Sequence, residues 1–240
     1  MREESLTRSH SPALSGNVLK VLAAAAMTLD HVGLVLLPGV QVLRLIGRIA
    51  FPIFAFMIAE GCAHTRSRAR YFLHLLVLAA VCQTAYTVAM GQWFFCVPVS
   101  FSLAVLLILA LEKWKNARGP GLVLWSLVFL GAVAAAWVLN QHITLDYGFW
   151  GLMMPVAASF FRKKGGKLDH NLVHVLAMAL CMVPLALYLG PWQWWSFLAL
   201  PFLKLYSGKR GRYKMKYFFY IFYPAHLLVI EGLAMLLSTW

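Results

Sequence analysis

The residues best suited to chemistry in this sequence lie inside hydrophobic runs. Asp30 and His31 fall within the apolar run 18–37, which is long enough to cross a bilayer. A charged side chain at that depth costs at least about 2.5 kcal/mol, so an ionisable residue there indicates a functional site. A neutral imidazole can take a proton from an amine or hydroxyl near neutral pH. We predict that His31 is a general base; the alternative is a structural histidine bonded inside a bundle.

The spacing of Lys20 and His31 adds a geometric prediction. Ten residues separate them, so a helix makes about three turns between them and both side chains lie on nearly one face, about 16 Å apart. Lys20 would then lie at the membrane surface and His31 beyond the midplane. Asp30 points about 100° away from His31. A partner for Asp30 must therefore come from another helix.

The amino-acid composition indicates that these residues are held by membrane-spanning helices. The chain has 240 residues, is 62% hydrophobic and only 12% charged, and has a mean hydropathy of +0.75. These values exclude a soluble domain and indicate an all-α, polytopic membrane protein with a single domain over 1–240. About nine transmembrane helices are predicted, some short enough to be tilted or re-entrant. The apolar runs are 18–37, 45–63, 71–90, 97–111, 121–139, 147–161, 172–189, 192–206 and 217–237.

The basic residues recur at every second connection between these runs. Nine spans with a cytoplasmic N-terminus place all of these clusters in the cytoplasm, as the positive-inside rule requires. The net charge of +13 is thereby explained by topology, and nucleic-acid binding is not supported. Of the 21 basic residues, only Arg44 and Arg48 would face outward. We predict that they hold a carboxylate or an anionic acceptor.

Other polar residues are candidates for supporting roles. Arg48 and Glu60 lie twelve residues apart on one span and cannot pair with each other, although each could simply stabilise the bundle. Asp146 is the only acid on the outer connections, and His226 is a second deeply placed histidine, which could be a ligand, a proton carrier or a packing residue. The cysteines lack the spacing of a zinc or redox motif, and no metal site is predicted.

Two prolines and one basic run also carry structural predictions. Pro52 and Pro224 should break helical hydrogen bonding at membrane depth. The run 204–216 is dense enough in positive charge to bind anionic lipid or a polyphosphate, although topology alone could account for it. Gly208 and Gly211 would let backbone approach a phosphate.

Four stretches resemble the TraX family of membrane acetyltransferases, whose founding type N-acetylates the pilin of conjugative plasmids. They are Leu19-Lys20 with Leu29-Asp30-His31; the long block from Leu43 to Arg66, including Leu43-Arg44-Leu-Ile-Gly-Arg-Ile-Ala-Phe-Pro-Ile-Phe; Asp146-Tyr147-Gly148 with Gly151; and Tyr206-Ser-Gly-Lys-Arg-Gly211 with Lys216-Tyr-Phe-Phe-Tyr-Ile-Phe-Tyr-Pro-Ala-His226. Lys20 and His31 are also similar to the Arg/Lys-x10-His pattern of wider transmembrane acyltransferases. Where family members tend to carry Asn-x-x-x-Thr, this chain has Pro98-Val-Ser-Phe-Ser102, so the acceptor can differ.

The resemblance implies an acyltransferase that uses acetyl-CoA or a related acyl-CoA from the cytoplasm. His31 and Asp30 would be catalytic, by direct transfer or through an acetyl-histidine intermediate. The donor-binding residues would be Lys20, Arg66, Lys209, Arg210, Arg212 and Lys216. The acceptor-side or supporting residues would be Arg44, Arg48, Glu60, Asp146, Tyr147, Tyr223 and His226.

The expected partners are acyl-CoA, the lipid bilayer and an acceptor that is a peptide N-terminus, a glycan or a small molecule. The expected location is the inner or plasma membrane of a bacterium. A secondary transporter for an anionic solute is the rival function, because intramembrane His, Asp, Glu and Arg also mark ion and substrate paths. Inverted repeats would favour the transporter, and none is evident in the sequence.

Overall fold

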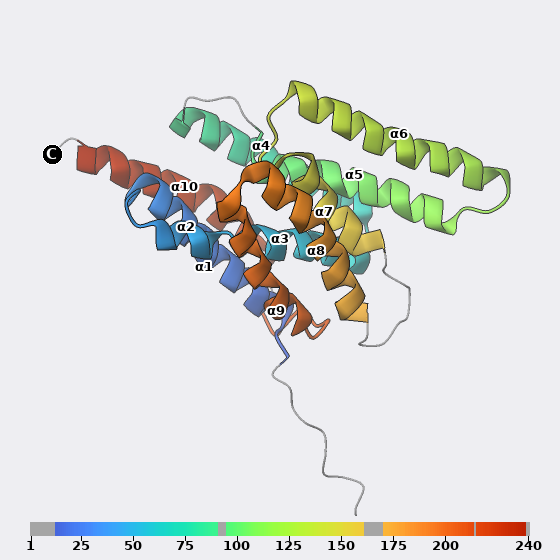
Figure 1. The fold of residues 1–240 in the computed structure, drawn as a ribbon, viewed down its shortest axis with the longest axis horizontal. Coiled ribbons are helices and arrows are strands. Elements are labelled where there is room, and N and C mark those ends of the chain that lie inside the picture. The colour runs from blue at the N-terminus through green and yellow to red at the C-terminus, as the bar shows by residue number, and fades with distance from the viewer. Residues whose placement is uncertain (1–12, 91–94, 161–169, 214, 239–240) are drawn as a thin grey trace, which may run out of the picture.

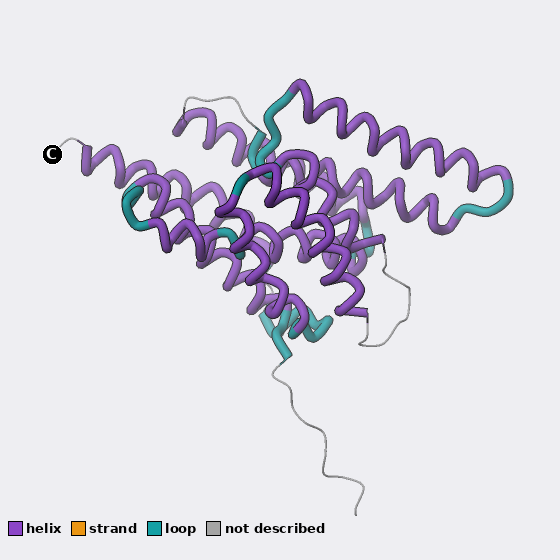
Figure 2. Tube along the Cα trace, viewed as in Figure 1, coloured by secondary structure: helices purple, strands orange, loops and turns teal. Residues whose placement is uncertain are grey.

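The computed structural model of the protein describes residues 13–90, 95–160, 170–213 and 215–238 and consists almost entirely of helices joined by short loops (Figures 1 and 2). The elements are α1 (Gly16–Val35), α2 (Gln41–Gly47), α3 (Ala50–His64), α4 (Arg68–Met90), α5 (Val97–Asn116), α6 (Pro120–His142), α7 (Gly148–Phe160), α8 (His170–Leu189), the 3₁₀ helix η1 (Pro191–Leu198), α9 (Ala199–Lys204) and α10 (Lys216–Ser238).

Seven helical segments in the described ranges are long and apolar enough to cross a membrane. The most lipophilic is α6, with a hydropathy of 2.4, and Phe129 is its only buried residue. A helix that is apolar on every side and covered on only one is stable in lipid rather than in water. The prediction of an all-α polytopic membrane protein is confirmed.

The two remaining apolar runs form shorter elements. α7 has 13 residues, and η1 with α9 covers the run 192–206. At their rises per residue these elements extend about 20 Å and about 25 Å. The bundle surrounds much of α7, where Leu152 and Met154 are fully buried, so its shortness exposes little backbone to lipid.

α3 lies at the centre of the bundle, packed against α1, α5 and α7. Its start explains the role of Pro52. This proline occupies the first turn of α3, where its missing N–H removes no helical hydrogen bond. The predicted disruption therefore takes the form of a break between α2 and α3, and Arg48 is the C-cap residue of α2 at that break. Pro224, by contrast, lies inside α10.

Contacts between loops and helix termini show which ends of the helices lie together at each end of the bundle. At one end, Leu14 bridges to Tyr206, Arg68 pairs with Glu112 at 2.8 Å, and the Lys115 ammonium donates to the carbonyl of Phe160 at 2.7 Å. At the other end, Phe95 bridges to Leu145, between α4–α5 and α6–α7. The described basic clusters gather at the first end, as the alternating charge pattern predicts. We call it the basic end.

Candidate functional site

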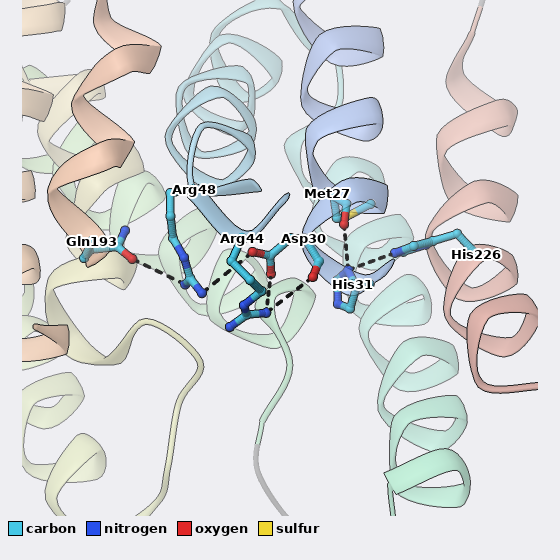
Figure 3. Close-up of polar contacts among 7 residues, drawn as sticks. All are labelled: Met27, Asp30, His31, Arg44, Arg48, Gln193 and His226. Carbon is cyan, nitrogen blue, oxygen red and sulfur yellow. Dashed lines mark hydrogen bonds and ion pairs between the residues drawn. The ribbon is translucent and has the colours of Figure 1, made fainter. Parts of the chain in front are cut away.

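Asp30 lies between two arginines from the neighbouring helix pair (Figure 3). The Arg44 guanidinium donates to Oδ2 of Asp30 at 3.0 Å, and Nη2 of Arg48 lies 3.7 Å from Oδ1. The prediction that the partner of Asp30 comes from another helix is confirmed. Arg44 and Arg48 do hold a carboxylate, and it belongs to this chain.

Two glycines permit this arrangement because they let α2 approach α1 closely. A Cβ on Gly33 would lie 2.8 Å from Cβ of Leu43, and a Cβ on Gly47 would lie 2.7 Å from Cγ of Asp30. Both distances are shorter than ordinary van der Waals contact. The absence of a side chain at Gly47 therefore leaves the space that the Asp30 carboxylate occupies.

The polar chain continues from Arg48 toward η1 and the α6–α7 connection. Nη1 of Arg48 donates to Oε1 of Gln193 at 3.5 Å, and Gln193 is only 1% exposed. Burial raises the pKa of Asp146 to about 6, while the positive charge of Arg48 opposes the rise. Tyr147 has a φ of 61° and stacks on Phe51 with ring centroids 3.8 Å apart. Asp146 and Tyr147 therefore lie close enough to Arg48 for its charge to act on both of them.

His31 faces the last helix. Its Nδ1 lies 2.8 Å from the carbonyl oxygen of Met27 and 3.4 Å from Nε2 of His226. A carbonyl oxygen only accepts hydrogen bonds, so the neutral His31 ring carries its proton on Nδ1. Within the described residues, no hydrogen bond reaches Nε2 of His31. This nitrogen has a free lone pair, which is what a general base requires.

Lys20 confirms the predicted helix face. Its ammonium lies 5.8 Å from the ring centroid of Phe219 on α10, the helix that also carries His226. Lys20 and His31 thus both face α10, and Lys20 lies near the basic end. Tyr223 of the same helix packs edge-on against His226, with ring centroids 5.6 Å apart.

The basic segment, defined here as residues 204–216, is attached to the start of α1. The N–H groups of Gly16 and Asn17 donate to the carbonyls of Lys209 and Arg210, both at 2.8 Å. The Asn17 side-chain amide donates to the carbonyl of Tyr213 at 2.7 Å. These bonds hold the basic segment beside Lys20 through backbone groups, so the cationic side chains take no part in them.

Most of the predicted donor-binding residues are exposed at this end. Arg66, Lys209, Arg210 and Arg212 are exposed, whereas the side chain of Lys216 lies outside the described part of the structure. Glu60 does not approach the arginine cluster: the Tyr206 hydroxyl donates to its Oε2 at 3.0 Å. Glu60 therefore links α3 to the basic segment.

A family model described as TraX protein matches residues 15–234. The chain belongs to the TraX family.

Two curated proteins are similar to this chain over very different lengths. The chain is 27% identical over 246 residues to "Probable fimbrial assembly protein FimC, serogroup H1" of Dichelobacter nodosus, covering 92% of this chain and 96% of the relative. It is 55% identical over 40 residues to "Uncharacterized protein RP591" of Rickettsia prowazekii (strain Madrid E), covering 17% of this chain and 16% of that protein. No solved structure matches.

The structure of this TraX-family chain adds residues that the sequence analysis missed. Gln193 lies in a tryptophan-rich run that is also typical of an interfacial belt, which obscures its buried amide. Glu231, whose charge acts on His31, has one buried carboxylate oxygen without a hydrogen bond to any described residue. It could have been found, because it is the only acid in the run 217–237. The residues that the structure describes contain no group of three or more His, Cys, Asp or Glu able to hold a metal ion.

Proposed function

We propose that this TraX-family protein is a membrane-embedded acyltransferase of the bacterial inner or plasma membrane, with a cytoplasmic N-terminus. It moves an acetyl or related acyl group from cytoplasmic acyl-CoA to an amine or hydroxyl at the membrane or its outer side. The observation that carries the proposal is the orientation of His31: its Nδ1 donates to Met27, and its Nε2 has no hydrogen bond to any residue that the structure describes. A base so oriented is suited to a nucleophile that must lose a proton.

In the proposed reaction, His31 first accepts a proton and then gives it up. Its Nε2 takes the proton of the acceptor amine or hydroxyl as that group attacks the thioester carbonyl. The carbon–sulfur bond then breaks, and the leaving thiolate takes the proton from the imidazolium. Products are the acylated acceptor and free CoA, and His31 returns to its neutral form without another co-reactant.

The basic end supplies the charge that the donor needs. CoA carries several phosphates, which require cationic partners. Lys20 and the exposed Lys209, Arg210 and Arg212 lie together at one end of α1, and His31 lies about 16 Å farther along the same helix face. An extended pantetheine arm reaches over such a distance, so the phosphates can stay at the basic end while the thioester meets His31.

The name of the fimbrial relative suggests which acceptor to test first. We propose a pilus-subunit N-terminus as that acceptor, with a glycan and a small-molecule amine or alcohol as the other classes.

Steady-state kinetics in lipid nanodiscs tests the proposal. With acetyl-CoA and a peptide amine, His31→Ala should lower turnover by about a hundredfold or more, the scale of general acid–base catalysis. Lys20→Ala should instead raise the apparent KM for acetyl-CoA. His74→Ala is a matched control, because His74 is a half-buried histidine on α4 whose ring stacks on Tyr220 of α10 and not on His31. Near-normal turnover in folded His31→Ala contradicts the mechanism, and solute uptake into sealed vesicles without CoA release supports the transporter instead.

A further inference from the structure

His226 and His31 form a contact that the acyl transfer described above does not use. Their ring centroids lie 5.0 Å apart in a T-shaped arrangement, and Nε2 of His226 lies 3.4 Å from Nδ1 of His31. His226 is only 7% exposed. A buried imidazole pair is costly unless its protons and lone pairs are matched.

The tautomer of His226 follows from its own helix. Its Nδ1 lies 3.0 Å from the carbonyl oxygen of Phe222, which can only accept, so the proton is on Nδ1. The remaining nitrogen, Nε2, therefore presents a lone pair to the Nδ1–H of His31. That N–H is shared between two acceptors, the Met27 carbonyl at 2.8 Å and His226 Nε2 at 3.4 Å.

Packing fixes the orientation of the His226 ring. It stacks on Phe222 with an interplanar angle of 6° and centroids 5.2 Å apart, and Tyr223 packs against it at 87°. The lone pair of Nε2 consequently keeps its direction toward α1 while His31 changes charge.

From this geometry we infer that His226 is a positioning residue: its Nε2 accepts the Nδ1–H of His31, holding the His31 ring with Nε2 toward the acceptor and stabilising the imidazolium. The inference rests on the proposed function for its catalytic meaning. When His31 gains a proton, its Nδ1–H bonds become charge-assisted and stronger, whereas the bonds of the neutral ring stay weak. An acceptor in this position therefore favours the transition state over the resting state.

Two substitutions of His226 distinguish the effect of its hydrogen-bond acceptor from the effect of its ring packing. His226→Phe keeps a flat ring for stacking on Phe222 and removes the acceptor, while His226→Gln can place an amide oxygen near the position of Nε2. We expect His226→Phe to lower kcat about tenfold or more, equivalent to about 1.4 kcal/mol. The KM for acetyl-CoA should change little, because the donor phosphates lie at the basic end. His226→Gln should recover part of the lost kcat. His74→Phe is the matched control, since it alters another histidine stacked on α10 that lacks the contact with His31.

A second measurement reports on the pairing without activity. The ¹⁵N resonances of ring-labelled histidine in nanodiscs, assigned by loss of the His31 signals in His31→Gln, report its tautomer. Wild type should show His31 protonated on Nδ1, and His226→Phe should add the other tautomer or ring averaging. Identical His31 resonances in both proteins, or wild-type kcat in folded His226→Phe, overturn the inference. Absence of acyl transfer in the wild type contradicts the proposed function alone, and the ¹⁵N comparison then decides whether His226 orients His31.

Discussion

Replacing Gly47 with alanine should disrupt the candidate site without replacing any of its polar residues. The new Cβ would lie 2.7 Å from Cγ of Asp30 and closer still to its Cβ and Oδ1. Ordinary carbon–carbon contact needs about 3.5 Å or more, so α1 and α2 must separate by about 1 Å, or Asp30 must change rotamer. Either movement lengthens the 3.0 Å bond between Asp30 and Arg44 beyond hydrogen-bonding distance.

The magnitude combines two effects. Overpacking a close contact costs about 1–3 kcal/mol. Loss of the ion pair adds to this, because Asp30 and Arg48 have side chains only 15% and 16% exposed and would retain charges without good partners. We expect Gly47→Ala to lower the free energy of unfolding by about 2–4 kcal/mol in total.

Reversible unfolding in mixed micelles measures this change, and CoA release measures its effect on turnover. Gly39→Ala is the matched control, because it lies in the α1–α2 connection and a Cβ there meets nothing within 4 Å. If Gly47→Ala and Gly39→Ala unfold alike and turn over alike, the close approach of α2 to Asp30 does not shape the site.

Three further outcomes are expected. Arg48→Lys keeps the charge but loses the planar guanidinium that spans Asp30 and Gln193, so turnover should fall nearly as far as in Arg48→Ala; a wild-type rate in either variant removes Arg48 from the site. Neutralising Lys209, Arg210 and Arg212 together should raise the apparent KM for acetyl-CoA and flatten its salt dependence, and an unchanged salt slope would leave them a topological role only. Burial raises the pKa of Asp146 to about 6, so its charged form lowers the free energy of unfolding above that pH, and this loss disappears as pH falls from about 6 toward 4. At pH 8, Asp146→Asn should therefore have a free energy of unfolding about 3 kcal/mol above that of wild type. A difference between the two proteins that does not shrink at low pH refutes this.

Helical periodicity predicts which residues of one helix share a face, but it does not predict which residues of other helices they contact. The face shared by Lys20 and His31 depends only on residues within α1, so local geometry determines it, and their contacts with Phe219 and His226 confirm it. Asp30 needed a partner on another helix, but α1 alone could not identify that partner. The choice of Arg44 depends on Gly47 and on the break before α3, which are properties of packing between helices.

The sequence did not predict the contacts of two other buried polar residues, Glu60 and Gln193. The family resemblance implies that Glu60 is an acceptor-side or supporting residue, and the spacing of twelve residues already excluded a pair with Arg48. The sequence could not name its actual partner, Tyr206, which lies 146 residues away in the basic segment. Gln193 was missed because η1 is a 3₁₀ helix, in which every third side chain eclipses, and a helical or strand period does not detect its buried face.

α1 and α10 together connect the two halves of the proposed reaction. α10 begins where the basic segment ends, its Phe219 lies under the Lys20 ammonium, and its His226 meets His31. α1 begins where its first N–H groups bond the same basic segment. A donor whose phosphates bind that segment therefore lies at the start of a seam that ends at His31, and any shift of α10 along α1 changes the donor contacts and the histidine pair together. In the proposed reaction, this seam would let cationic residues at the basic end hold the donor phosphates while His31, about 16 Å farther along α1, acts on the thioester.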